Sequence, residues 1–277
     1  MTITVASDAA FSTTQLELQA TGSTGTVKVG LPLTVNLPAS VLLVDDDQSN
    51  NNFDSSALSP SDGLFRNLLP GSADYYVIHE IDATSNYEDG PTFEHMRSYE
   101  KVVWYCGSIF PKACVSASDE ARLAAFLDQG NRTLIIFSDV YPSQTGALSW
   151  AWNYIAGTWL TEYVGLKGLA NDLGNGLTFS VDGGSVLAGI SMVQAKDVPI
   201  TTYAQGLNPA VGTDTLFSTQ LDPDGSGVTS VAVTVGRRNV GAAGTSKVIL
   251  FTFPFENLTD VASPNTKAVV FSRLMTY

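Results

Sequence analysis

The segment VLLVDDD at residues 41–47 constrains the fold of this chain more than any other feature, because four apolar residues run directly into three aspartates. A continuous apolar run is typical of a parallel strand buried on both faces, whereas a strand with one face in water alternates apolar and polar residues. The abrupt change to carboxylates predicts that the strand ends at a polar rim. The segment therefore predicts a buried parallel sheet with an acidic edge.

Further apolar runs and helical segments alternate along the chain. The runs that predict strands are residues 75–78, 102–105, 133–137 and 248–251. Ser116 and Asp119 predict a capping box at the start of one helix, which ends near Gly130, and a final helix closes the chain. Strands that alternate with helices predict an α/β domain in which helices cover both faces of a parallel sheet.

Two other parts of the chain carry an antiparallel pattern. Residues 1–38 contain four short alternating runs and resemble the later strands of a bacterial immunoglobulin-like repeat, so we expect the sequence to begin inside a longer protein. Residues 165–245 are rich in Gly, Asp and Thr, and they predict a β-rich insertion. The predicted domains are therefore a partial immunoglobulin-like β segment at 1–38 and an α/β domain at 39–277.

The charge and the composition exclude several partners and favour a location. A net charge of −13, with 14 Lys plus Arg against 27 Asp plus Glu, argues against binding to nucleic acid or to anionic membranes, since both need clustered cations. No apolar stretch reaches the roughly 18 to 20 residues that a membrane span requires, so we expect no membrane insertion. The low lysine content and the acidic surface favour an extracellular or cell-surface protein.

The chain has two cysteines, Cys106 and Cys114, separated by a short loop that contains Gly107 and Pro111. Such a loop can turn back on itself, so we predict a disulfide between them if the compartment is oxidising. Two inert thiols are one alternative. The other is a nucleophilic or metal-binding Cys106, because this residue ends a predicted strand at the edge where parallel sheets bind ligands.

An acidic cluster follows the first parallel strand. Asp45, Asp46, Asp47 and Asp54, with three asparagines between them, offer many oxygen ligands within ten residues. Calcium prefers such ligands, so these four aspartates are the candidate metal site, although their spacing matches no EF-hand loop. The alternative is that backbone amides or solvent satisfy the carboxylates. No other cofactor is predicted.

Four segments of the chain carry a resemblance to a known family: VLLVDDD, KVVWYCGS, SASDEARLAAFLDQGNRTLIIFSD and SKVILFTFPFENL. Together they resemble the glutamine-amidotransferase-like domains of secreted, multidomain bacterial proteins. The resemblance covers roughly residues 40–277, and it implies a flavodoxin-like three-layer sandwich with a mainly parallel central sheet.

The residues that would carry the family's chemistry are absent. The family places a nucleophilic cysteine in a sharp turn after a central strand, with a histidine and a carboxylate later in the chain. The corresponding turn at residues 137–140 has no cysteine, His79 and His95 both lie too early, and Glu256 alone follows the last strand. The resemblance therefore implies a scaffold without that activity.

Three functional hypotheses follow. The first is a non-catalytic accessory or interaction module of a secreted or cell-surface bacterial protein, which contacts a partner protein or neighbouring domains through the strand-end rim or a sheet edge. The second is a hydrolase with Ser138 or Cys106 as its nucleophile, assisted by Asp139, Glu256 or a histidine. The third is a structural subunit of an extracellular assembly that self-assembles through its N-terminal strands.

Overall fold

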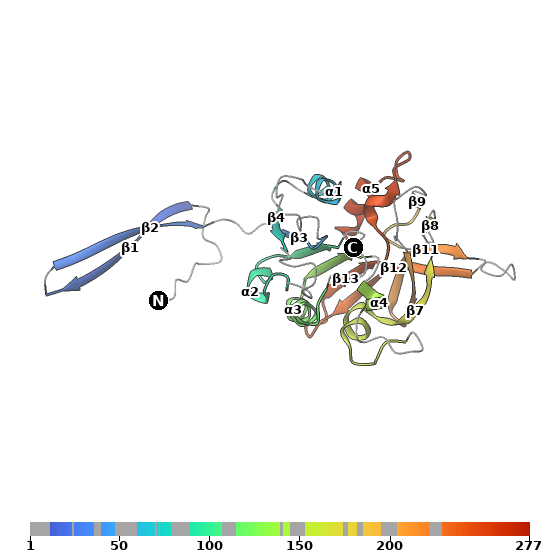
Figure 1. The fold of residues 1–277 in the computed structure, drawn as a ribbon, viewed down its shortest axis with the longest axis horizontal. Coiled ribbons are helices and arrows are strands. Elements are labelled where there is room, and N and C mark those ends of the chain that lie inside the picture. Colours follow the sequence, from blue (N-terminus) through green and yellow to red (C-terminus); the bar gives the residue numbers. More distant parts are fainter. Residues whose placement is uncertain are drawn as a thin grey trace. The chain divides into compact units, whose positions relative to one another are not determined.

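The computed structural model describes residues 12–23, 25–35, 40–47, 60–69, 71, 73–78, 89–106, 115–138, 141–144, 153–173, 177–181, 185–194, 204–221 and 229–277. The chain divides into two compact units, Met1–Ala39 and Ser40–Tyr277. Figure 1 draws both units.

The described part of the first unit is one β-hairpin. Strands β1 (Ser12–Gly22) and β2 (Gly25–Val35) pair antiparallel in an unbroken register along eleven residues each. The predicted immunoglobulin-like segment of four short strands is therefore wrong for these residues. A period of two is the same in one long strand as in two short ones, and Gly30, which lies between two of the short runs, pairs with Glu17 inside the hairpin.

Five parallel strands form one half of the sheet in the second unit. They are β3 (Val41–Asp45), β4 (Asp74–Val77), β5 (Lys101–Tyr105), β6 (Thr133–Phe137) and β13 (Ser246–Phe251). Their order across the sheet is β4-β3-β5-β6-β13. Every residue of β3 is buried, as its uninterrupted apolar run predicts. After β3 the chain forms β4 on one side of it and then returns to form β5 on its other side, so the strand order reverses between β3 and β5.

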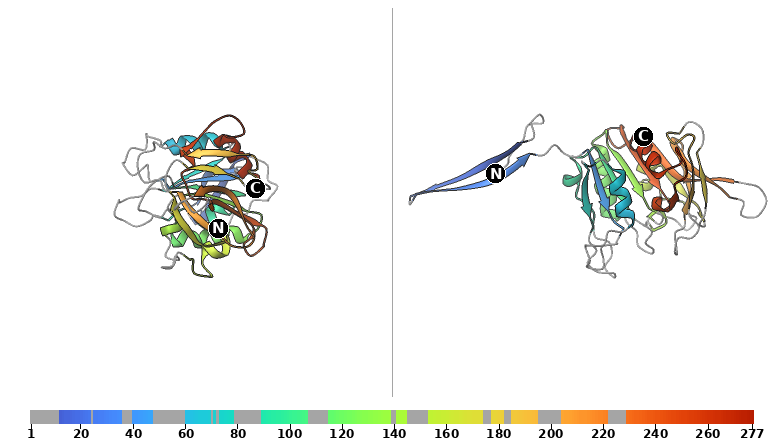
Figure 2. Two further views of the ribbon diagram at one scale, coloured as in Figure 1. Left: turned by 90° about the vertical axis from the view of Figure 1, so that its right-hand side faces the viewer. Right: turned by 90° about the horizontal axis from the view of Figure 1, so that it is seen from above.

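The other seven strands of this sheet are antiparallel to their neighbours. They are β7 (Leu166–Leu173), β8 (Thr178–Ser180), β9 (Ser191–Gln194), β10 (Ala204–Pro209), β11 (Thr213–Leu221), β12 (Thr229–Val240) and β14 (Leu258–Thr259). Since β12 pairs with β13, these strands continue the parallel half into one mixed sheet of twelve strands. Figure 2 shows the same arrangement from two further directions.

The predicted flavodoxin-like three-layer sandwich with a mainly parallel sheet is therefore wrong. Only five of the twelve strands that the structure describes in this sheet are parallel, and the remainder extends the sheet beyond β13. The physical reason is that β13 presents a second edge of unpaired backbone groups, which β12 satisfies. An alternating sequence pattern shows which residues form strands, but it does not show the edge on which they pair.

The helical elements of the second unit are short. They are α1 (Pro60–Leu68), α2 (Phe93–Met96), α3 (Ala117–Asp128), α4 (Tyr141–Gln144), the π-helical turn η2 (Leu160–Val164), the 3₁₀ turn η3 (Phe255–Asn257) and α5 (Lys267–Leu274). The predicted capping box is confirmed: the Ser116 hydroxyl accepts from the Asp119 amide, and the Asp119 carboxylate accepts from the Ser116 amide. Among the described residues, no helix is long and apolar enough to cross a membrane.

Aromatic rings stack across the carboxyl ends of the parallel strands. Tyr105, Phe137 and Phe251 occupy the same register position on β5, β6 and β13. The Phe137 and Phe251 rings are stacked 4.6 Å apart, and Phe65 of α1 stacks 4.5 Å from Tyr105. Phe271 of α5 packs against the same rings. This cluster joins both helices to one face of the sheet, directly beside the strand ends.

Candidate functional site

The candidate site lies at the carboxyl ends of β3 and β5, where the strand order reverses. Asp45 is the last residue of β3, Asp46 and Asp47 follow it, and Tyr105 and Cys106 end β5. All three aspartates are at most 4% exposed. Open α/β sheets bind ligands outside the carboxyl ends of their strands at such a reversal. The described rim residues therefore stand at a position suited to binding, although their side chains are buried.

Asp45 is held by protein donors. The Tyr75 hydroxyl donates to Asp45 Oδ2, and the Asp47 backbone amide lies 3.3 Å from Asp45 Oδ1. The hydroxyl oxygens of Tyr75 and Tyr105 are 3.1 Å apart, so the two tyrosines share a hydrogen bond. Burial raises the pKa of Tyr75 above its ordinary value, and the hydrogen bond to Asp45 raises it further. The pair is therefore a neutral phenol that donates to a buried carboxylate.

Asp46 is held in a similar way by an indole. Trp104 Nε1 donates to Asp46 Oδ2 across 2.9 Å, and Trp104 is 1% exposed. Gly90 packs against this ring so closely that a Cβ atom at Gly90 would lie 2.1 Å from it. The Gly90 amide in turn donates to Asp119 Oδ1 across 2.8 Å. The acidic rim is therefore braced, through Trp104, against the capping box of α3.

The candidate metal ligands are only partly within the described residues. Asp47 is buried beside Asp45 and Asp46, whereas Asp54 lies outside the described residues. In the part of the chain that the structure describes, no three His, Cys, Asp or Glu side chains converge in a way that could hold a metal ion. Calcium binding stays a prediction, which melting curves with calcium and with a chelator would test.

Cys106 is 3% exposed, and its backbone amide donates to the Phe137 carbonyl across 3.0 Å, which fixes it between β5 and β6. The described part of the chain contains no free cysteine. Cys114 lies outside the described residues, so the bond between Cys106 and Cys114 stays a prediction.

The other catalytic candidates are dispersed or buried. Ser138 follows β6 and is 1% exposed, and its hydroxyl accepts from the Tyr141 amide at 3.1 Å at the start of α4. Glu256 lies in η3 and is partly exposed, and Asp139 lies outside the described residues. The Ser138 hydroxyl therefore serves as a local cap in this structure.

The two histidines have separate positions. His95 belongs to α2, where its ring lies 5.3 Å from that of Tyr76 and 5.8 Å from that of Tyr99. His79 lies outside the described residues. His95 is exposed, and its described ring contacts are with these two tyrosines.

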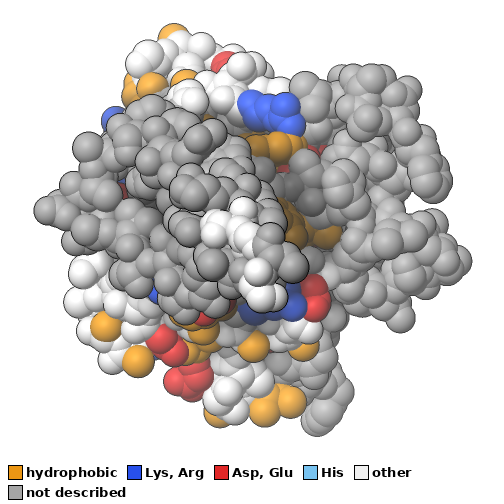
Figure 3. Space-filling model, turned by 90° about the vertical axis from the view of Figure 1, so that its left-hand side faces the viewer, with side chains coloured by type: hydrophobic (Ala, Val, Ile, Leu, Met, Phe, Trp, Pro, Cys, Tyr) orange, Lys and Arg blue, Asp and Glu red, His pale blue; other side chains and the backbone are white. Residues whose placement is uncertain are grey.

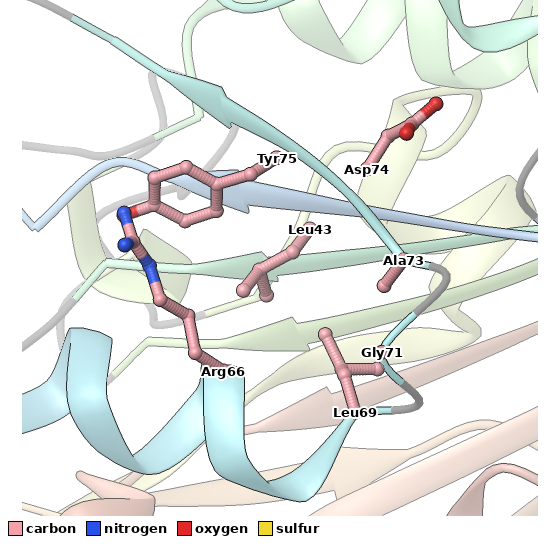
Figure 4. A pocket seen from close by; sticks show the side chains of 7 residues that line it. All are labelled: Leu43, Arg66, Leu69, Gly71, Ala73, Asp74 and Tyr75. Carbon is pink, nitrogen blue, oxygen red and sulfur yellow. The ribbon is translucent and has the colours of Figure 1, made fainter.

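A pocket that the sequence analysis missed opens beside the edge strand β4. Its volume is about 240 Å³, and its lining residues are Leu43, Arg66, Leu69, Gly71, Ala73, Asp74 and Tyr75. The Arg66 guanidinium lies 3.8 Å from the centre of the Tyr75 ring, a cation–π contact. Figure 4 shows Leu43 between these residues and Ala73, and the Asp74 carboxylate directed away from Arg66. No sequence motif marks this pocket, because its walls come from three separate elements.

Comparison with known proteins does not identify the chain. No family model matches it, and no curated protein matches it. A solved structure described as cytoplasmic protein STM3548 from Salmonella typhimurium is similar over 95% of each chain, with a TM-score of 0.44 and 9% identity. A likeness this weak carries no argument about fold or function. The resemblance to glutamine-amidotransferase-like domains stays a hypothesis that rests on the residues.

The predicted extracellular or cell-surface location finds no support in these comparisons, and the weakly similar solved structure is described as a cytoplasmic protein. The composition could not decide the location by itself, because an acidic, lysine-poor surface governs solubility and association and is compatible with several compartments.

A small substitution at Gly90 should disturb the whole rim. In Gly90→Ala the added Cβ must displace the Trp104 ring, which weakens its hydrogen bond to Asp46, so we expect a loss of about 1–3 kcal/mol in the free energy of unfolding. Urea denaturation and the near-ultraviolet circular dichroism of tryptophan measure this. The matched control is Gly63→Ala on α1, where a Cβ meets open space. Equal stability of the two variants would contradict the bracing of the rim.

The Tyr75–Asp45 pair should give stability a defined pH dependence. Because the pKa of Tyr75 is raised on folding, its contribution is complete below the ordinary tyrosine pKa of about 10 and is lost as the pH rises above that value. Tyr75→Phe lacks this contribution. We therefore expect the difference in unfolding free energy between wild type and Tyr75→Phe to shrink between neutral pH and about pH 11. A difference that stays constant would contradict the assignment.

Intact mass spectrometry of protein purified without reductant tests the cysteines. A bond between Cys106 and Cys114 lowers the mass by two hydrogens relative to the reduced chain, and the mass should rise on reduction. Two thiols that react with iodoacetamide before reduction would show that the disulfide prediction is wrong.

Proposed function

We propose that this chain is a non-catalytic interaction module, which holds an extended segment of a partner protein along β4 with one partner side chain in the adjacent pocket. The observation that carries the proposal is the position of that pocket at the end of a twelve-stranded sheet. The resemblance to glutamine-amidotransferase-like scaffolds without their catalytic residues is compatible with it.

Strand β4 has the properties of a docking edge. It is the terminal strand of the sheet, and among the described strands it pairs only with β3 (Figure 1). An edge strand presents backbone N–H and C=O groups to which another extended chain can add. In such complexes the backbone hydrogen bonds give affinity and neighbouring pockets select the side chain. Asp74 is exposed, whereas Tyr75 and Tyr76 are half-buried, so the outer edge of β4 is accessible at its beginning.

The pocket favours a partner side chain of mixed character. Leu43, Leu69 and Ala73 form an apolar wall of the pocket. At one end of the pocket, Arg66 places a positive charge over the Tyr75 ring. A side chain with an apolar body and a terminal carbonyl or carboxylate oxygen matches both features. On the face drawn in Figure 3, cationic, acidic and apolar side chains of the described residues are interspersed.

The burial of the rim favours binding over hydrolysis. Ser138 and Cys106 are at most 3% exposed, and Asp45 and Asp46 accept hydrogen bonds from Tyr75 and Trp104. A nucleophile must be presented to substrate beside a base that can take its proton. Labelling by a fluorophosphonate probe that is lost in Ser138→Ala would favour the hydrolase hypothesis instead.

A structural role in an assembly is the second candidate, and the hairpin of the first unit favours it. A two-stranded sheet is marginally stable in water, and within the described residues β1 and β2 pair only with each other. Addition of a strand from another copy would satisfy an open edge. Light scattering that shows a monomer at high protein concentration would exclude this role.

Filling the pocket tests the proposed function. We expect a random peptide display library selected on the 277-residue chain to yield peptides that bind wild type but bind Gly71→Trp at least about tenfold more weakly. A Cβ at Gly71 meets no atom within 4 Å, so the indole can occupy the pocket without a backbone clash.

The matched control for this experiment is Gly63→Trp, which also has open space at its Cβ but does not line the pocket. Selected peptides should bind Gly63→Trp as they bind wild type. If no peptide is enriched, or if the enriched peptides bind Gly71→Trp with unchanged affinity, the proposal is wrong.

A further inference from the structure

A second hollow lies in the antiparallel half of the sheet, on strands that take no part in the rim or the β4 pocket. This groove has a volume of about 410 Å³. Its described lining comes from β7, β10, β11 and β12 and consists of Ala170, Leu207, Asn208, Pro209, Thr215, Ser218, Thr229, Ser230, Val231 and Ala232.

The groove forms where β10 and β12 diverge. The two strands pair at a single position, Leu207 with Ala232. Beyond it, Asn208 and Pro209 pair with β7, whereas β12 pairs with β13 only from Thr234 onward. Among the described strands, residues 229–231 of β12 therefore have a partner only on their β11 side. They form a short sheet edge that opens into the groove.

Irregular pairing surrounds this opening. The register of β10 against β7 shifts between Asn208 and Pro209, and the register of β11 against β12 shifts between Thr215 and Ser218. All four of these residues line the groove. Bulges redirect side chains and are enriched beside functional sites. Pro209 has no N–H group, so it cannot donate to a ladder with β12.

The seam between β10 and β12 also has unused hydrogen-bonding capacity. Gln205 of β10 and Thr234 of β12 are 4% and 0% exposed. Gln205 Oε1 and Thr234 Oγ1 are buried without a hydrogen-bond partner in the described contacts. On this side of the single paired position, however, Thr252 bridges the two strands, because its hydroxyl oxygen lies 2.6 Å from the Gln205 carbonyl oxygen and 2.8 Å from that of Val233. The open edge is therefore confined to residues 229–231 among the described strands.

The chemistry of the lining selects the class of ligand. None of the described lining residues is charged, so the groove has no counterion for an anion and no carboxylate for a metal ion. None is aromatic, so it has no ring on which a base can stack. Small side chains and hydroxyl groups let another backbone approach closely. Ser230 is exposed. Val231 and Ala232 are 8% exposed and provide apolar surface in the groove.

We infer that this groove binds an uncharged, extended peptide segment, which adds to β12 at residues 229–231. Backbone hydrogen bonds to the open edge hold the segment, and alternate small or β-branched side chains enter the groove. The site is separate from the β4 pocket and does not depend on the function proposed for it.

Hydrogen exchange of the full chain tests this inference, with a capped hexapeptide of alternating threonine and valine as the probe. We expect millimolar peptide to slow amide exchange at residues 229–231 in wild type. Ser230→Lys places a charge on the edge, which opposes strand addition, so it should bind the peptide at least about tenfold more weakly. A hexapeptide of alternating threonine and glutamate should give less protection than the uncharged probe.

Thr178→Lys is the matched control, because Thr178 is an exposed position on β8 outside the groove lining. It should bind as wild type does, and an unchanged urea midpoint shows that Ser230→Lys is folded. Unchanged exchange at residues 229–231, or equal binding by Ser230→Lys and wild type, would overturn the inference. Loss of hexapeptide binding in Gly71→Trp would place the peptide at β4 and would also overturn it.

Discussion

The aromatic stack across the strand ends is the interaction on which the second unit depends. Tyr105, Phe137 and Phe251 stand side by side because three parallel strands share one register, and Phe65 and Phe271 bring α1 and α5 onto the same face. Burial of large rings supplies most of the stabilisation that a core can offer. The same packing fills the space beside the carboxyl ends of the strands, where many related sheets hold their ligands.

Beside that packing, the three aspartates of the rim are buried rather than exposed to solvent. Asp45 and Asp46 are buried, and an ionised carboxylate can be buried only where donors replace water. The Tyr75 hydroxyl and the Trp104 indole are such donors, and Gly90 lets the indole reach its position. The two proposed binding sites lie elsewhere, where the described strands leave an edge without a partner strand: at β4 and in the opening between β10 and β12.

The candidate site was only partly predictable from the sequence. A strand that ends in three aspartates, beside another that ends in Cys106, can be identified from the chain because parallel strands bring their carboxyl ends to one edge. The donors to those aspartates could not, since Tyr75 and Trp104 lie about 30 and 60 residues away and look like ordinary core residues. Arg66 gave no signal either, because its pocket exists only where α1 meets the edge strand.

For the fold, local pattern by itself determined the buried parallel strands, the capping box at Ser116 and Asp119, and the division of the second unit into a parallel part and an antiparallel part. These features depend on residue spacing and on hydrogen bonds between near neighbours. Tertiary structure alone decided that β12 joins β13, so that both parts form one mixed sheet in place of a layered sandwich with an insertion. It also decided that the described N-terminal runs, at residues 12–22 and 25–35, form one long hairpin, whereas the run at residues 3–5 lies outside the described residues. Strand pairing is a contact between distant segments, and a period of two is identical whichever neighbour a strand chooses.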